Sequence, residues 1–391
     1  MKPIYLDYNA TTPIAPEVAE AMMPYLNGFF GNPSSSHFYG RQTKNAIENA
    51  RKQLADLLHC KPSEVIFTSG GSESNNYALK GYAFANQDKG KHIITSSIEH
   101  PAIIEVCKFL ETKGFDLTYL PVDSTGRVLL SDVKNAIRPD TILISIMYAN
   151  NEVGTLQPIT EISNLARMNS IAFHSDCAQA VGKVPVNVQE LGVDLLSLAG
   201  HKFYGPKGIG ALYIREGISL QKLIHGADHE NNLRAGTENV LEIVGLGKAA
   251  ELAKEKEAEC MKHEKGLVQL LRKNLSKISD VQFNGNPEYC LPNTLSASFK
   301  NFQASEFLRL LKNVAASAGA ACHTDSICVS PTLEAMKVPL EYAMGTIRFS
   351  LGRFNTKSEI EIASHEIIAV VTNLQREEKK SKKNRERNKY Q

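Results

Sequence analysis

Residues 194–214 read DLLSLAGHKFYGPKGIGALYI, and this stretch decides the fold class of the chain. Its first part, LLSLAG (195–200), is short and apolar, which is typical of a buried strand, and a glycine-rich turn follows at once. Lys202 stands at that turn. A lysine at the end of a buried strand is a candidate Schiff-base amine, because burial lowers its pKa and frees the nitrogen lone pair. A surface lysine in a turn is the alternative that this segment alone leaves open.

Strand-like runs also occur before and after this stretch, with amphipathic segments such as 44–58 and 101–114 between them. The seven expected strands are EVIFTSG (64–70), HIITSS (92–97), LTYLPV (117–122), TILISIMYAN (141–150), SIAFHSD (170–176), LLSLAG (195–200) and GALYI (210–214). This alternation predicts an α/β fold with a mainly parallel seven-stranded sheet and helices on both faces. Such sheets bind ligands beyond the carboxyl ends of their strands.

The length of 391 residues favours more than one domain. We expect residues 16–260 to form a large domain and residues 261–378 a smaller α+β domain, which residues 1–15 join. A long helical region, 238–277, leads from one to the other. The small domain is expected to contain strands 293–299 and 346–352 and helices 305–313 and 358–375. The end of the chain, 379–391, holds seven Lys or Arg and one Glu, and we expect a disordered tail, with binding of nucleic acid as a lesser alternative.

Composition argues against several classes of protein. There is no run of 18 apolar residues, and the start MKPIYLDYNATTP has no long apolar segment, so we expect neither a membrane span nor a signal peptide, and a cytoplasmic location. The cysteines are scattered without a CxxC pair, which argues against a disulfide scaffold and a zinc site. No metal is expected. The cysteines stand at positions 60, 107, 177, 260, 290, 322 and 328.

Polar groups follow several of the expected strands. Gly71 and Ser72 lie between a strand and a helix, where they could bind an anion or merely cap the helix. Asp176 ends a strand and could face a ring nitrogen or cap a helix, and His100 could stack on a flat ring, move protons or be structural. Together with Lys202 they match pyridoxal phosphate, which needs an imine-forming amine, a pyridinium partner and an anion site.

Eight motifs in combination resemble the NifS/IscS-type cysteine desulfurases and the related selenocysteine lyases of the class V aminotransferase family. The resembling segments are YLDYNATTP (5–13), GNPSS (31–35), FTSGGSESNN (67–76), ANNEVG (149–154), IAFHSDCAQA (171–180), GHKFYGPKGIGALY (200–213), RAGTEN (234–239) and IRFSLGR (347–353). The likeness extends to about residue 375. It implies a pyridoxal-phosphate-dependent transferase of fold type I that works as a homodimer.

The resemblance also implies a role for each matching residue. Lys202 would hold the cofactor through its amine, Asp176 would pair with the pyridinium nitrogen, and His100 would stack on the ring. The remaining contacts would be Asn151 and Gln179 near the ring oxygen, Gly71, Ser72 and His201 at the phosphate, Thr237 at the phosphate of the neighbouring subunit's cofactor, and Arg348 with Asn151 at the substrate carboxylate.

A second catalytic element is expected in SAGAACHTDSICVSPTL (317–333), where small residues precede Cys322 and favour a loop that can move. The loop alone favours a buried or merely exposed thiol without a catalytic role. The resemblance implies that Cys322 attacks the substrate sulfur and leaves as a persulfide while alanine is released. Cys328 is expected to be a bystander, with a regulatory disulfide to Cys322 as a lesser alternative.

The chain departs from the family at several positions. Ala199 stands where many members have a phosphate-binding serine, and 226–237 lacks the usual glycine run. The segment around Cys322 resembles the selenocysteine lyases, whereas Pro101 replaces the acidic residue of the vertebrate-type lyases. We therefore predict a desulfurase for L-cysteine, with L-selenocysteine as the alternative substrate and an iron–sulfur scaffold or another sulfur carrier as the acceptor. An aminotransferase and a non-catalytic scaffold are more remote alternatives.

Overall fold

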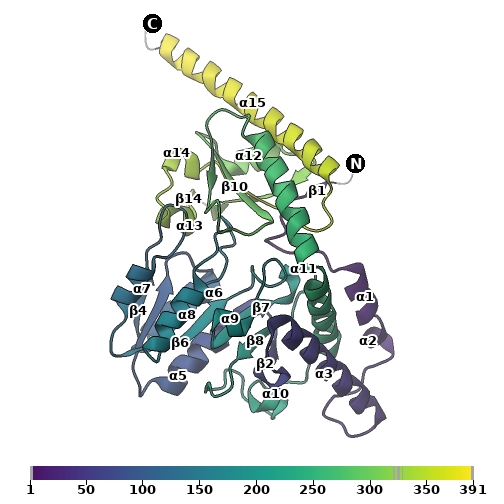
Figure 1. The fold of residues 1–391 in the computed structure, drawn as a ribbon. Helices are drawn as coiled ribbons and strands as arrows, with labels where there is room; N and C mark the ends of the chain where they lie inside the picture. The colour runs from purple at the N-terminus through teal and green to yellow at the C-terminus, as the bar shows by residue number, and fades with distance from the viewer. Residues whose placement is uncertain (1–2, 320–321, 324–325, 328, 389–391) are drawn as a thin grey trace.

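Seven strands form the larger sheet, in the order β2–β8–β7–β6–β5–β3–β4 (Figure 1). Their bounds are β2 Val65–Thr68, β3 His92–Ser96, β4 Asp116–Leu120, β5 Thr141–Ser145, β6 Ala172–Asp176, β7 Leu195–Ala199 and β8 Gly210–Ile214. Only β8 runs antiparallel to its neighbours, β2 and β7. The computed structural model describes residues 3–319, 322–323, 326–327 and 329–388. It confirms the predicted α/β fold and its mainly parallel sheet.

Both faces of this sheet are buried, because successive strand residues enter two different cores. Ile93 of β3 belongs to one core and Ile94 to the other, and Leu195 and Leu196 of β7 divide in the same way. A strand buried on both faces needs a continuous apolar run, which is why the sequence showed these strands clearly. The helices of this domain are α1 Pro16–Met22, α2 Pro24–Asn27, α3 Phe38–Leu58, α4 Gly71–Asn76, α5 Tyr82–Asn86, α6 Pro101–Glu111, α7 Leu130–Ala136, α8 Ile159–Met168, α9 Val188–Leu191 and α10 His229–Asn232.

A four-stranded antiparallel sheet forms the centre of the smaller domain, in the order β12–β15–β10–β9. Its strands are β9 Val281–Asn284, β10 Thr294–Phe299, β12 Ser317–Ala318 and β15 Thr346–Ser350, and its shorter helices are α12 Ala304–Leu310, α13 Pro331–Ala335 and α14 Leu340–Ala343. The start of the chain reaches this domain, because β1 (Ile4–Tyr5) pairs in parallel with β11 (Val314–Ala315).

One long helix, α11 (Val240–Leu275), belongs to both domains (Figure 1). Its residues up to Met261 pack on a core of the large domain, and from Leu267 onward they pack on the core of the small one. The two domains are thus joined by an uninterrupted helix as well as by the N-terminal segment.

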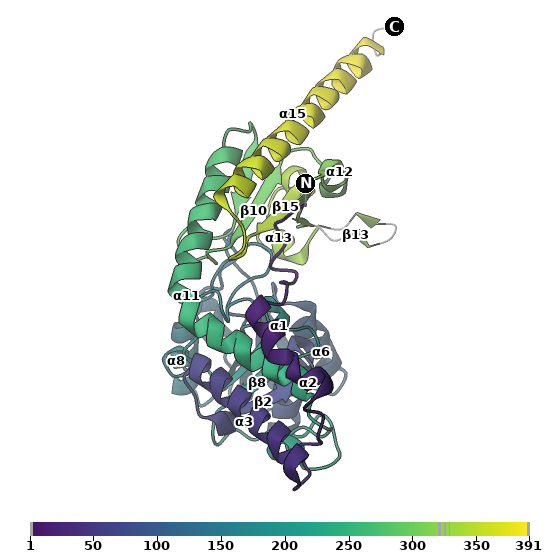
Figure 2. The same cartoon turned by 90° about the vertical axis from the view of Figure 1, so that its right-hand side faces the viewer.

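The last helix, α15, spans Lys357–Asn388 and extends away from the small domain (Figures 1 and 2). It therefore continues past Gln375, where the sequence pattern ended it, and through residues 379–388, which we expected to be disordered. This segment contains neither Gly nor Pro and is rich in Lys, Arg and Glu, so nothing in it stops a helix. No helix in the described part of the chain is long and apolar enough to cross a membrane.

Candidate active site

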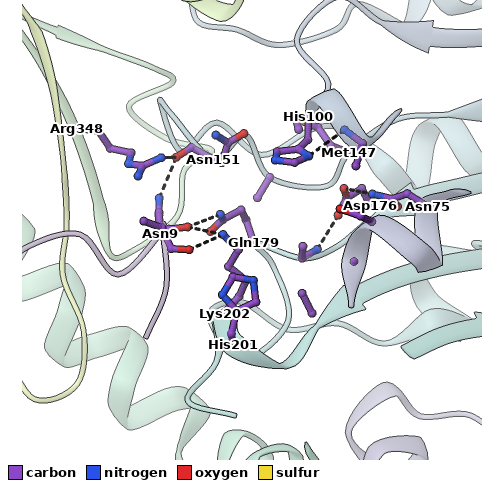
Figure 3. Close-up of a pocket in the computed structure, with 17 residues that line it drawn as sticks. Asn9, Asn75, His100, Met147, Asn151, Asp176, Gln179, His201, Lys202 and Arg348 are labelled. Atoms are coloured by element: carbon purple, nitrogen blue, oxygen red, sulfur yellow. Dashed lines mark hydrogen bonds between the residues drawn. The ribbon is translucent and has the colours of Figure 1, made fainter. Parts of the chain in front are cut away.

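A cavity of about 380 Å³ lies at the carboxyl ends of the parallel strands, as expected for this sheet type (Figure 3). Five strand ends contribute to its wall, namely those of β2, β3, β5, β6 and β7. The N-terminal segment and β15 of the small domain complete it. The residues that line it are Asn9, Ala10, Gly71, Ser72, Asn75, His100, Ala102, Met147, Ala149, Asn151, Asp176, Ala178, Gln179, Ala199, His201, Lys202 and Arg348.

Lys202 ends a short 3₁₀ turn, Gly200–Lys202, directly after β7. Its amine donates to the backbone carbonyl oxygens of Asn9 and Ala10, each at 2.8 Å. Burial, followed by the positive charge of Arg348, lowers the pKa of Lys202 to about 8. A sizeable fraction of this amine is therefore neutral near physiological pH, which a nucleophile that attacks a carbonyl carbon requires.

Asp176 ends β6 and is almost completely buried. Its Oδ1 accepts the backbone N–H of Ala178 at 2.9 Å, and its Oδ2 accepts the side-chain amide of Asn75 at 2.7 Å. These two bonds fix the orientation of the carboxylate. Neither of these partners carries a charge, and a positively charged group bound in the cavity would stabilise the buried carboxylate further.

His100 caps α6, and its Nδ1 accepts the backbone N–H of Ala102 at 3.1 Å. The proton of the neutral ring is therefore on Nε2. Burial is the main cause that lowers the pKa of His100, and the positive charge of Lys202 lowers it further. The negative charge of Asp176 acts in the opposite direction. The ring is thus neutral at pH 7, which suits it both to stack on a flat group and to exchange a proton.

One end of the cavity has the chemistry of an anion site. Gly71 and Ser72 begin α4, and an adjoining cavity of about 500 Å³ shares both residues and also contains Lys207. His201 lines both cavities, and its Nδ1 lies 3.1 Å from the hydroxyl oxygen of Thr11. Burial and the charges of nearby lysines lower the pKa of His201 to about 4, so its ring is neutral. Ala199 lines this region as well.

Arg348 enters the cavity from β15, on the side away from Asp176 (Figure 3). Its guanidinium donates to the carbonyl oxygen of Asn151 at 3.1 Å and to Asp7 Oδ1 at 2.8 Å. Its Nε is buried and has no hydrogen-bond partner in the described structure. A guanidinium held in this way can take a carboxylate as a further partner.

The structure brings most of the predicted residues together, but not all of them. Thr237 does not line this cavity; it lines a separate one of about 200 Å³. Its expected contact with a second subunit stays a prediction. The backbone of Cys322 lies in β13 (Cys322–His323), which pairs with β14 (Ser326–Ile327) in a hairpin beside the small domain (Figure 2). The side chain of Cys322 and all of Cys328 lie outside the described residues.

Four residues at or beside this site escaped the sequence analysis: Asp7, Asn9, Asn75 and Lys183. Asn9 and Asp7 are part of the motif YLDYNATTP, but nothing local to that motif indicates a role for either. Asn75 had a weak signal, since it follows the Gly-Gly-Ser turn by one helical turn. The role of Lys183 depends on contacts with a segment more than 170 positions earlier.

The groups around the cavity fit pyridoxal phosphate. The amine of Lys202 is partly neutral, the oriented carboxylate of Asp176 can face a pyridinium nitrogen, and the Gly71–Ser72 turn can bind a phosphate. The family model "Aminotransferase class-V" matches residues 4–362. The chain belongs to the class-V aminotransferase family.

Individual members of the class-V aminotransferase family are similar over almost the whole chain. The "Cysteine desulfurase IscS" of Dictyoglomus turgidum is 53% identical, and the alignment covers 91% of both chains. A solved NifS-like protein has a TM-score of 0.90 and 38% identity, covering 95% of this chain and 99% of its own. The structure of SspA in complex with cysteine has a TM-score of 0.79 and 40% identity, covering 90% of this chain and 100% of its own. As in this family generally, the cofactor is pyridoxal phosphate.

Proposed function

We propose that this protein is a cysteine desulfurase, which moves the sulfur of L-cysteine to Cys322 as a persulfide and releases L-alanine. The observation that carries the proposal is the cavity in which the Lys202 amine, the Asp176 carboxylate and the Arg348 guanidinium meet. Further support comes from the desulfurase relatives and from the cysteine bound by SspA.

Three residues of the cavity have a task in this reaction: Arg348, Lys202 and His100. When bound, pyridoxal phosphate supplies an electron sink that weakens the bonds around the α-carbon of an amino acid. Arg348 binds the substrate carboxylate through its free donor and so orients the amino acid. The amine of Lys202 would hold the cofactor and, once the substrate is bound, would move protons, and neutral His100 can exchange a proton at Nε2.

The sulfur step then needs one thiolate. The thiolate of Cys322 attacks the sulfur of the substrate, so that an S–S bond forms while the C–S bond breaks. The electron pair of that bond remains on carbon, which takes up a proton and becomes the methyl group of alanine. A persulfide on Cys322 can pass its outer sulfur to an acceptor, for which we propose an iron–sulfur scaffold or another sulfur carrier.

We also propose that the enzyme acts as a homodimer. An exposed apolar patch, which we call the α2–α3 patch, supports this assembly, since an exposed cluster of aromatic side chains typically marks an interface. It consists of Met23, Leu26, Phe30, Phe38 and Tyr39. In a dimer, Thr237 would reach the phosphate of the partner's cofactor.

Product analysis tests the activity. Purified protein given L-cysteine and a thiol reductant is expected to release alanine and sulfide in equal amounts. The variant Lys202→Ala should lose the visible absorption band of the bound cofactor. Cys322→Ser should keep this band but lose sulfide release by about a hundredfold or more.

A second thiol provides the matched control. Cys260 is half-buried, and burial raises its pKa, so Cys260→Ser is expected to behave as wild type. Release of a keto acid instead of alanine would identify an aminotransferase and contradict the proposal. Sulfide release that survives Cys322→Ser would remove Cys322 from the mechanism.

A further inference from the structure

Lys183 has no part in the chemistry above, yet its amine is buried directly behind the active-site cavity. It lies in the turn that follows β6, and its Nζ donates to Gln179 Oε1 at 2.6 Å and to Asn9 Oδ1 at 3.0 Å. Lysine is rarely buried, because its charge loses hydration. An apolar side chain at this position would avoid that cost, so the amine calls for an explanation.

The charged groups around Lys183 come from several elements. Burial lowers its pKa to about 7, and Lys202 and Arg348 act in the same direction. The carboxyl group of Glu264, buried on α11, acts in the opposite direction. Burial raises the pKa of Glu264 itself to about 8. The surroundings of Lys183 therefore disfavour a charge on its amine, while the hydrogen bonds of the amine remain.

The contacts of Lys183 determine which way the amide of Gln179 faces. The Lys183 amine donates to Gln179 Oε1 at 2.6 Å, so the oxygen of the amide faces Lys183. On its other side, Gln179 Nε2 donates to the backbone carbonyl oxygen of Asn9 at 2.9 Å, and a carbonyl can only accept. Both neighbours thus require the same orientation. One N–H of the amide is then left over, on a side chain that lines the cavity.

Asn9 connects this arrangement to the catalytic amine (Figure 3). Its backbone carbonyl oxygen accepts from both Gln179 and Lys202, at 2.9 and 2.8 Å. Its side-chain oxygen accepts from Lys183 and from Asn293 Nδ2, the latter at 3.1 Å. Lys183 therefore anchors the side chain of the residue whose main chain orients Lys202.

We propose that Lys183 is a positioning residue, which locks the Gln179 amide so that its remaining N–H donates to the ring oxygen of bound pyridoxal phosphate. This inference rests on the proposed function insofar as the cofactor must occupy the cavity. Without Lys183 only the Asn9 carbonyl would hold the amide. The amide could then more easily turn its oxygen toward the ring oxygen, where two acceptors would repel each other.

The test compares the holoenzymes of Lys183→Met, Gln179→Leu and the double variant. The readout is the midpoint of the pH titration of the visible band. A donor stabilises negative charge on the ring oxygen, so its loss should raise that midpoint by about 0.5–1 pH unit. Cofactor dissociation should become about tenfold more favourable. The double variant should match Gln179→Leu alone, because Lys183 acts only through Gln179.

Two further variants separate this role from a structural one. Lys183→Gln retains an N–H donor toward Gln179 and should keep the wild-type midpoint even if Lys183→Met folds poorly. Lys134→Met, at an exposed lysine of α7, is the matched control. An unmoved midpoint in Lys183→Met, or additive shifts in the double variant, would overturn the inference while leaving the proposed function intact. A wild-type protein without any visible band would instead refute the proposed function.

Discussion

Lys202 combines a position at the end of a buried strand with an amine that titrates near neutral pH. Burial lowers its pKa to about 8. Only the neutral amine can capture pyridoxal phosphate, so capture by the apoenzyme should accelerate as the pH rises through about 8 and level off above it. With a solvent-exposed lysine, the rate of capture would rise until the pH reached the ordinary pKa of about 10.4. Stopped-flow recording of the growing visible band between pH 6 and 10 measures this profile, and a midpoint near 10 would show that the amine is not desolvated.

Single residues differed in how well the sequence predicted them. Lys202 and Asp176 were predicted because each stands at or just after the end of a strand-like run. The local pattern therefore also places each of them at the edge of the sheet where ligands bind. Asp7 was not predicted, although it holds Arg348 at 2.8 Å across 341 positions. Such a contact depends on the two ends of the chain, which come together in the small domain. It leaves no periodic signal in either segment.

Among the elements, α3, β2 and the loop that carries α10 are held together by one buried ion pair. Arg51 on α3 bonds Glu230 through two nitrogens, at 2.7 and 2.9 Å. The same carboxylate accepts the backbone N–H of Phe67 in β2 at 2.8 Å. Glu230 also has a left-handed backbone, with φ at 48°. The Glu230 carboxylate therefore connects the loop that leads to Thr237 to both α3 and β2.

Removing one charge from this pair should be costly, because the other would stay buried without a partner. We expect Glu230→Gln to lower the free energy of unfolding by about 3 kcal/mol in urea titrations. The exposed pair of Lys61 and Glu216 provides the control, and Lys61→Met should leave stability unchanged within error. Equal stability of wild type and Glu230→Gln would mean that the ion pair does not hold the loop.

Elements with a strong local pattern were predicted well. Six of the seven strands of the large sheet lie within two residues of their expected bounds, because burial on both faces demands unbroken apolar runs. The exception is β5, which ends at Ser145, five residues before its expected end at residue 150. The end of α15 was missed because the expectation relied on charge rather than on helix-breaking residues. The short strands β1 and β11 gave no signal, since two residues cannot show a period.

At the scale of the whole molecule, Asn9 links the two domains at the amine of Lys202. Besides its bonds to the large domain, its Nδ2 donates to Thr294 Oγ1 at 2.8 Å, and its backbone N–H donates to Ser350 Oγ at 2.9 Å. Thr294 and Ser350 are both in the sheet of the small domain. The position of Lys202 is therefore set by contacts from both domains, and no single element determines it.

The α2–α3 patch allows the proposed dimer to be tested. Phe30 is 74% exposed and Phe38 is 64% exposed, and Tyr39 packs against both rings, so an apolar surface is left facing solvent. A dimer would bury this surface, and a carboxylate placed there would oppose burial. We therefore expect the double variant Phe30→Glu and Phe38→Glu to sediment as a monomer of 43.0 kDa.

The same variant connects assembly with the cofactor, because Thr237 is proposed to reach the phosphate of the neighbouring subunit. Loss of the dimer should weaken the visible band and the retention of pyridoxal phosphate together. Met168, which is 84% exposed on α8, provides the matched control, and Met168→Glu should remain dimeric with an unchanged band. If the double variant of Phe30 and Phe38 stays dimeric, the subunits must meet through another face. If it becomes monomeric but keeps its band, the cofactor site is complete within one chain and Thr237 has no role across the interface.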